Sequence, residues 1–369
     1  MKNGLITGLL CLLSVFSVAQ NGDYFLYVGT YTRKTSEGIY GYRFNAQTGK
    51  LTQAGIAKGV SNPSFLAFSP DHWFLYAVGG STGDSVRAFS VDQQTHALTL
   101  LNSEALGDKG GVHLAVDKTR KWLIVGCYNS GSISVLPIEP DGSLGKVSQL
   151  IRHEGKSIDP ERQTKPYVHS ITIAPNNRDV FVPDLGTDRV VTYTLNARTG
   201  QLRPGTPPFT AVTPGSGPRH FTIHPNGKFA YLIQEMGGLI TAFRYKKGGL
   251  ETLQTVKTLP YTYTGRTWSA DIHISPDGKF LYGSNRAHES LAIYSIDQKT
   301  GLLTFVGHQS VQGKTPRNFA IDPTGNFVLV ANQDTDNVTV FRRDKQTGLL
   351  TFTGTEITVS MPVCLLFTR

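Results

Sequence analysis

Residues 218–235 read Pro-Arg-His-Phe-Thr-Ile-His-Pro-Asn-Gly-Lys-Phe-Ala-Tyr-Leu-Ile-Gln-Glu, and the chain repeats this pattern along its length. Residues 270–286 and 316–332 carry the same order of a short apolar segment, a turn and a longer apolar run. Weaker copies begin near residues 63, 112 and 168, so the period is about 46–55 residues. Such a period indicates an array of small units that pack on their neighbours, not one large core.

Each copy predicts four antiparallel strands. The first is short, as at 319–322, and ends in a turn such as Pro225-Asn-Gly, where proline presets φ and glycine tolerates positive φ. The second is an apolar run, and the third alternates apolar and polar residues, as at 338–341. A Thr-Gly-x-Leu turn, for example at Thr300-Gly301, leads to the fourth. No long segment has the periodicity of an amphipathic helix.

The two chain ends supply parts of one further unit. Residues 24–57 carry a second, third and fourth strand without a first, and residues 362–367 carry a first strand alone. We therefore expect the two chain ends to complete one four-stranded unit together, which closes the array into a ring and removes exposed strand edges. The predicted fold class is all-β: a seven-bladed β-propeller of four-stranded antiparallel blades, closed by the N- and C-terminal strands in one blade.

Residues 1–19 have the composition of a secretory signal peptide. Lys2 precedes an apolar run from Leu5 to Val18, and small residues Ser17 and Ala19 fit cleavage before Gln20. A membrane anchor is the alternative, but the run is short for a bilayer span. We expect export to the periplasm or the extracellular space, no membrane attachment after cleavage, and one propeller domain over residues 20–369.

Composition restricts the partners. The formal net charge is +9, but many lysines lie in turns and no basic run is interleaved with aromatic residues, so we expect no nucleic-acid partner. Cys127 and Cys364 lie in separate apolar strands and are expected to be buried free thiols. No Gly-rich phosphate loop, His-x-x-x-His pair or Gly-x-Ser-x-Gly motif occurs, so no cofactor or metal is expected. We expect a monomer.

Aligning the copies brings four polar residues of three adjacent blades to one end of the central channel: His169, Arg219, Glu235 and Arg286. In a propeller, the loop that enters the first strand and the loop that leaves the second lie on the same face. An imidazole, a carboxylate and two guanidinium groups around a narrow mouth suit hydrolysis of an anionic ester, because arginine binds carboxylate or phosphate and stabilises an oxyanion. Either the histidine or the glutamate can take a proton from water.

Neighbouring positions hold candidate substrate-binding residues, each of which also has a purely structural interpretation: His113, Asp184, His220, Asp271 and Arg317. Two long loops, 153–163 and 259–268, are expected to overhang the same face. Long loops on a rigid scaffold carry binding contacts or cap a channel, and both roles stay open at this point.

At these residues the chain resembles the seven-bladed propeller lactonase family, which includes a bacterial form of 6-phosphogluconolactonase and fungal carboxy-muconate lactonising enzymes. The matching segments span nearly the whole mature chain: Tyr27–Thr32, His153–Gly155, Asp159–Gln163, Val168–Ser170, Val182–Arg189, Gly217–His220, Ala270–His273, Ser284–Arg286 and Val330–Asp334. The resemblance implies a metal-independent lactone site built on His169, Arg219, Glu235 and Arg286.

Three functions remain open from the sequence. The first is a lactonase that hydrolyses a small sugar or sugar-acid lactone in carbohydrate metabolism, a carboxylic ester hydrolase similar to 6-phosphogluconolactonase. The second is a cycloisomerase that closes a muconate-type dicarboxylate to a lactone. The third is a non-catalytic propeller that binds a glycan or a protein.

Overall fold

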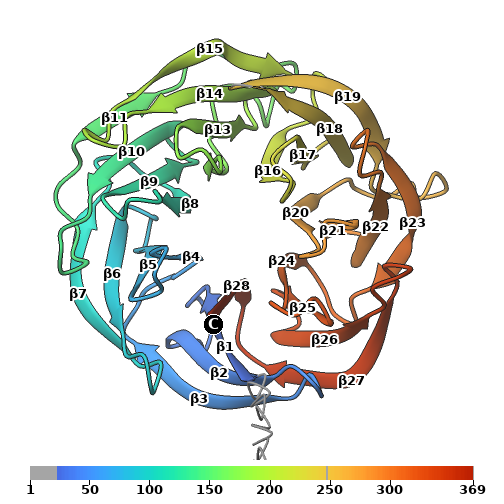
Figure 1. The fold of residues 1–369 in the computed structure, drawn as a ribbon, viewed down its shortest axis with the longest axis horizontal. Coiled ribbons are helices and arrows are strands. Elements are labelled where there is room, and N and C mark those ends of the chain that lie inside the picture. The colour runs from blue at the N-terminus through green and yellow to red at the C-terminus, as the bar shows by residue number, and fades with distance from the viewer. Residues whose placement is uncertain (1–22, 247, 369) are drawn as a thin grey trace, which may run out of the picture.

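The computed structural model describes residues 23–246 and 248–368. These residues form seven four-stranded antiparallel sheets arranged as a ring around a central channel (Figure 1). The predicted seven-bladed propeller is therefore confirmed. The predicted signal peptide at 1–19 lies outside the described residues. None of the described residues forms a helix that is long and apolar enough to cross a membrane.

The blades follow one another along the chain, and each contains four strands. Blade 1 holds β1 (Asp23–Thr30), β2 (Gly38–Asn45), β3 (Leu51–Lys58) and the last strand β28 (Pro362–Thr368). Blade 2 holds β4 (Phe65–Phe68), β5 (Phe74–Gly79), β6 (Ser85–Val91) and β7 (Leu98–Ala105). Blade 3 holds β8 (Gly111–Val116), β9 (Trp122–Cys127), β10 (Ser132–Pro137) and β11 (Gln149–Arg152).

The second half of the ring has the same order. Blade 4 holds β12 (Thr172–Ile173), β13 (Asp179–Asp184), β14 (Arg189–Leu195) and β15 (Leu202–Ala211). Blade 5 holds β16 (Pro218–Ile223), β17 (Phe229–Gln234), β18 (Leu239–Lys246) and β19 (Gly249–Lys257). Blade 6 holds β20 (Ser269–Ile274), β21 (Phe280–Asn285), β22 (Ser290–Ile296) and β23 (Leu303–Ser310). Blade 7 holds β24 (Pro316–Ile321), β25 (Phe327–Asn332), β26 (Asn337–Arg343) and β27 (Leu350–Thr358).

The chain ends close the ring as expected. Strand β28 pairs antiparallel with β1, from Phe25 opposite Thr368 to Gly29 opposite Cys364. β28 thereby takes the innermost position of blade 1, which the first strand occupies in every other blade (Figure 1). Cys127 and Cys364 are both free and buried, as predicted.

Neighbouring blades pack through apolar faces, and the repeated turn residues fasten them together. In the core between blades 5 and 6, Tyr231 and Ile233 of β17 pack with Leu281 of β21. The Tyr231 hydroxyl donates to the carbonyl of Gly301, in the Thr-Gly turn of blade 6, at 2.9 Å. Gly301 has φ +76°, and a Cβ there would lie 2.4 Å from Cδ1 of Phe229, so this turn accepts only glycine without strain.

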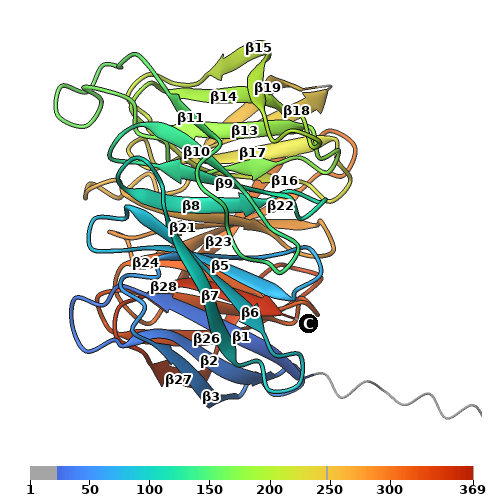
Figure 2. The same ribbon diagram turned by 90° about the vertical axis from the view of Figure 1, so that its left-hand side faces the viewer.

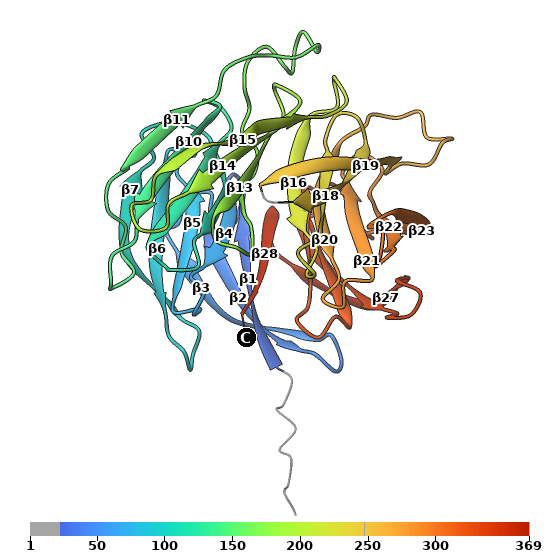
Figure 3. The same cartoon turned by 45° about the horizontal axis from the view of Figure 1, so that its top comes forward.

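The strands run across the thickness of the ring, so the connecting loops gather on its two faces (Figure 2). The loop between β11 and β12 projects well beyond the strand ends (Figure 3). This loop contains residues 153–163, which the sequence predicts to overhang the candidate site.

Candidate active site

A buried carboxylate organises the site. Oε2 of Glu235 lies 2.7 Å from Nη2 of Arg286 and 3.2 Å from Nε of Arg219. Oε1 of Glu235 accepts a hydrogen bond from Nη2 of Arg162 at 2.7 Å. Glu235, Arg219 and Arg286 are each at most 3% exposed, whereas the side chain of Arg162 is 35% exposed. Three guanidinium groups therefore converge on one carboxylate.

Local strand geometry places three of these side chains. Glu235 and Arg286 immediately follow the second strands of blades 5 and 6, β17 and β21. Between β16 and β17, Pro218 pairs with Gln234 and His220 pairs with Ile233, so Arg219 is the extra residue of a β-bulge. Arg317 occupies the same bulge position in β24. Bulges re-aim side chains, and both arginines line the mouth of the channel.

Arg162 was not among the site residues predicted from sequence. It lies in the loop between β11 and β12, and that loop has no equivalent in the other copies, so the repeat alignment gives it no column. Two signals point to it: it is a cation within a long loop predicted to overhang the site, and it lies in Asp159–Gln163, one of the segments that resemble the lactonase family. The other overhanging loop also contributes, because Trp268 stacks on the guanidinium of Arg286, with the ring centroid 4.0 Å from Cζ.

The electrostatics keep Glu235 ionised. Burial alone raises the pKa of a carboxylic acid, but the positive charges of Arg286, Arg219 and Arg162 outweigh burial and hold the pKa of Glu235 well below its usual range. Burial and repulsion from Arg317 lower the pKa of Arg219 to about 10, despite the opposing effect of Glu235. At neutral pH the cluster therefore carries a fixed carboxylate and an excess of positive charge.

His169 lies beside this cluster and is neutral. Its Nε2 is 3.9 Å from Oε2 of Glu235, and its ring packs edge-on against Tyr128 and His220. Burial, followed by repulsion from Arg219, holds the pKa of the imidazole well below its usual value. Within the described residues its Nδ1 has no hydrogen-bond partner. A neutral imidazole keeps one ring nitrogen that can accept a proton.

A small cavity opens at the mouth of the channel. Its volume is about 20 Å³, which is room for about one water molecule. Arg317 stands on its wall with its guanidinium 5.4 Å from the ring centroid of Tyr31. In the part of the chain that the structure describes, no carboxylate pairs with Arg317, so its charge is available to an anion. The lining residues are Tyr31, Ser64, Phe65, Val112, His169, Arg219, His220, Arg317, Asn318 and Val363.

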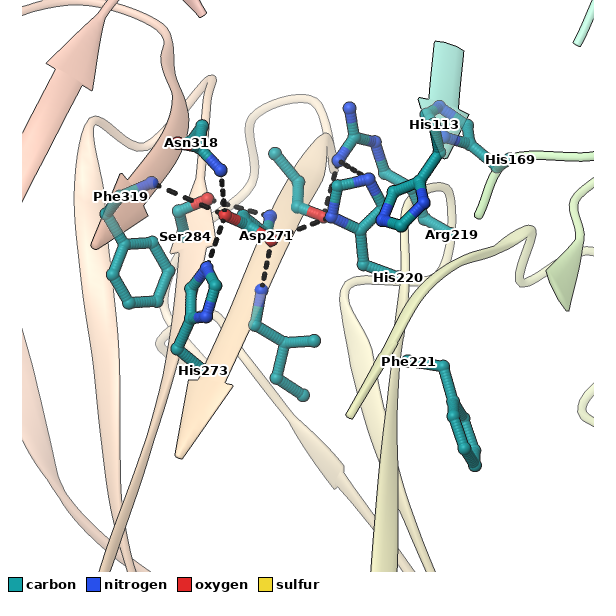
Figure 4. Close-up of polar contacts among 12 residues, drawn as sticks. His113, His169, Arg219, His220, Phe221, Asp271, His273, Ser284, Asn318 and Phe319 are labelled. Carbon is teal, nitrogen blue, oxygen red and sulfur yellow. Dashed lines mark hydrogen bonds and ion pairs between the residues drawn. The ribbon is translucent and has the colours of Figure 1, made fainter. Parts of the chain in front are cut away.

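Of three further predicted residues, His220 and Asp271 form a hydrogen-bonded pair, and His113 packs beside His220 (Figure 4). Nδ1 of His220 lies 2.7 Å from Oδ1 of Asp271, and the ring of His220 packs edge-on against that of His113. Nδ1 of His113 accepts a hydrogen bond from the backbone N–H of Ile171 at 3.3 Å. His220 and Arg317 therefore line the cavity together with His169 and Arg219, and His113 packs on His220. Asp271 is buried and contacts the cavity-lining residues through His220.

Asp184 does not lie with them. Its Oδ2 is 2.8 Å from Nδ1 of His153, and its Oδ1 accepts hydrogen bonds from the backbone N–H groups of Tyr167 and Gly186. It is the last residue of β13, one position before the column that contains Glu235, and successive side chains of a strand point to opposite sides. Asp184 therefore secures the stem of the loop that carries Arg162.

The described residues contain no group of three or more His, Cys, Asp or Glu side chains arranged to hold a metal ion.

Comparison with known proteins agrees with this geometry. A family model described as "Lactonase, 7-bladed beta-propeller" matches residues 25–367. The chain belongs to this family. The 6-phosphogluconolactonase of Bacillus subtilis is 35% identical over 300 residues, which cover 80% of this chain and 84% of that protein.

Solved structures of family members are also similar. A 6-phosphogluconolactonase candidate from Bacteroides fragilis superimposes with a TM-score of 0.90 and 41% identity, covering 96% of this chain and 99% of the other. The periplasmic gluconolactonase of Pseudomonas aeruginosa gives a TM-score of 0.89 and 34% identity, covering 94% and 99%. The lactonase propeller thus extends over nearly the whole described chain.

Proposed function

We propose that this protein is a carboxylic ester hydrolase that opens a sugar or sugar-acid lactone. The observation that carries the proposal is the cluster in which Glu235 holds Arg219 and Arg286 beside a neutral His169 at the mouth of a cavity. The names of the relatives support the same reaction, since they are 6-phosphogluconolactonases and a gluconolactonase.

His169 is the proposed general base. Water attacks the lactone carbonyl carbon, and the imidazole accepts one of its protons. The ester C–O bond then breaks, and the ring oxygen leaves as the alcohol after taking the proton back from the imidazolium. The sequence leaves Glu235 as an alternative base, but both of its carboxylate oxygens are already paired with guanidinium groups. Its negative charge instead stabilises the imidazolium that forms 3.9 Å away.

The arginines take the charges of the substrate. Arg219, which lines the cavity, faces the carbonyl oxygen and stabilises the oxyanion as negative charge develops on it, and Arg286 adds its positive charge from the other side of Glu235. Arg317, which lacks a protein carboxylate among the described residues, binds a phosphate or carboxylate substituent. His220 completes the wall next to the sugar hydroxyls. These assignments need neither a metal nor a cofactor.

We further propose that residues 1–19 are a cleaved signal peptide and that residues 20–369 act as a monomeric domain in the periplasm or outside the cell. A lactonase there meets unphosphorylated aldonolactones more readily than cytosolic sugar phosphates. The similarity to a protein named as a periplasmic gluconolactonase supports this location.

The decisive experiment is a lactone panel. Purified protein is assayed with glucono-δ-lactone, 6-phosphogluconolactone and other aldonolactones, with and without a chelator, and tested for ring closure of muconate-type dicarboxylates. We expect lactone hydrolysis that the chelator does not reduce. Ring closure without hydrolysis would instead favour a cycloisomerase, and binding without any turnover would favour a non-catalytic propeller.

A further inference from the structure

The bonds around Arg219 point to a positioning role for a residue that does not reach the cavity. We propose that Asp271 fixes the orientation of Arg219 through His220, so that one guanidinium nitrogen stays directed at the substrate. This inference rests on the proposed lactonase function, because Arg219 is the substrate-facing group. It assigns Asp271 and His220 as positioning residues and not as groups that touch the reacting atoms.

The partners of His220 determine its tautomer. Nε2 of His220 lies 3.2 Å from Nη1 of Arg219, and a guanidinium nitrogen only donates, so Nε2 must accept. Nδ1 therefore carries the proton and donates it to Oδ1 of Asp271 at 2.7 Å. Burial, followed by repulsion from Arg219, lowers the pKa of His220 to about 4 even though Asp271 opposes the change. The ring therefore stays neutral and keeps this direction at neutral pH.

Hydrogen bonds to protein groups engage two of the three guanidinium nitrogens of Arg219. Its Nη1 donates to the carbonyl of Ala270 at 2.7 Å as well as to His220, and its Nε donates to Glu235 at 3.2 Å. Within the described residues, Nη2 is left without a protein partner. The arginine is thus held from two sides with one nitrogen free, which is the arrangement that an oxyanion donor needs.

Asp271 is itself held by hydrogen bonds from its own blade and from the next one. Its Oδ2 accepts hydrogen bonds from Nε2 of His273 at 2.9 Å and from Nδ2 of Asn318 at 2.5 Å (Figure 4). Asn318 in turn accepts from the backbone N–H of Leu365 at 2.7 Å. The carboxylate on β20 therefore connects Arg219 on β16 with β24 and with the ring-closing strand β28. Rigid support of this kind keeps a substrate-binding group in place.

The main variant is Asp271→Asn. It keeps the shape of the side chain but places an NH₂ group, which cannot accept, opposite one of the hydrogen-bond donors that now face the carboxylate. We expect kcat/KM for the best lactone of the panel to fall by about 10- to 100-fold, in the range found for groups that orient a ligand-binding residue. Asp117→Asn is the matched control, because Asp117 is a fully buried carboxylate that accepts bonds from the β8–β9 turn and from Asn177. It should lower Tm but leave kcat/KM unchanged.

A double-mutant cycle tests the route of the effect. If Asp271 acts through Arg219, Asp271→Asn will cost much less in an Arg219→Lys background than in the native one, since lysine has no fork to orient. An equal loss in both backgrounds, or a loss in Asp271→Asn that only matches the Asp117→Asn control, would overturn the proposal.

A readout that needs no turnover separates this inference from the proposed function. The Nδ1 proton of His220, observed by ¹H–¹⁵N NMR with selectively labelled histidine, should be protected from exchange in the native protein and lost in Asp271→Asn. Its absence in the native protein contradicts the chain of bonds. A protected proton in a protein that hydrolyses no lactone would instead refute the proposed activity.

Discussion

Arg162 and Glu235 are 73 residues apart in the chain, yet Nη2 of the arginine donates to Oε1 of the glutamate at 2.7 Å. The arginine comes from the loop between β11 and β12, and the glutamate comes from the end of β17. The other two arginines on this carboxylate, Arg219 and Arg286, come from the repeated blade scaffold. The site therefore combines a rigid base of strands with one cation supplied by a loop.

Removing that loop cation should weaken the site without destroying it. We expect Arg162→Gln to lower kcat/KM for lactone hydrolysis by roughly 10-fold, the equivalent of about 1.4 kcal/mol. The pKa of Glu235 should rise, because Arg162 is one of the groups that lower it. Steady-state kinetics and carboxylate titration by ¹³C NMR measure the two effects.

Arg189→Gln is the control for this change. Arg189 begins β14 and stacks on Phe209, with Cζ 4.2 Å from the ring centroid, outside the arginine cluster. The Arg189→Gln variant should leave kcat/KM unchanged. Native kinetics in Arg162→Gln would show that the loop contact is only a surface pairing.

His169 should carry the proton transfer. We expect His169→Asn to lower kcat by about 10²- to 10⁴-fold while changing KM little, since general-base catalysis contributes about that much. Because the pKa of His169 is well below its usual value, native kcat/KM should stay flat from neutral pH down to mildly acidic pH. A native-like kcat in His169→Asn, with the protein folded by circular dichroism, would transfer the base role to another group.

Much of this site was predictable from sequence, and its exceptions have physical causes. The repeat period determines the blades, and the blades bring Arg219, Glu235 and Arg286 to one mouth. The repeat alignment does not assign Arg162 to the site, because its loop occurs in one blade and has no aligned position in the others. The repeat alignment places Asp184 next to the column of Glu235, but neighbouring strand residues face opposite sides, so Asp184 points away from the cluster. Contacts such as that between His220 and Asp271 depend on side-chain direction across two blades, which a one-dimensional pattern does not contain.

Acid stability should depend on Glu235. Its folded-state pKa is lowered, so the ionised form stabilises the fold at pH above the ordinary value of 4.5, and this stabilisation is lost as pH falls through the folded-state pKa. Glu235→Gln leaves buried Arg219 and Arg286 unpaired and should cost about 3–5 kcal/mol at neutral pH. Urea unfolding between pH 2 and pH 7 measures the loss at neutral pH and the pH dependence of the free energy of unfolding. We expect this free energy to fall less steeply with decreasing pH in the variant. Parallel curves for the two proteins would contradict the assignment.

The glycine of the Thr-Gly turn should be required for blade packing and not only for the turn. Gly301→Ala places a methyl group 2.4 Å from the Phe229 ring at φ +76°, so both strain and overpacking oppose it. Gly227→Ala is the matched control, since Gly227 has φ +69° but nothing within 4 Å of the added Cβ. We expect Gly301→Ala to lose about 1–3 kcal/mol more than Gly227→Ala in urea unfolding, the usual cost of overpacking. Equal losses would mean that backbone conformation alone selects glycine there and that the contact between blades 5 and 6 tolerates a larger residue.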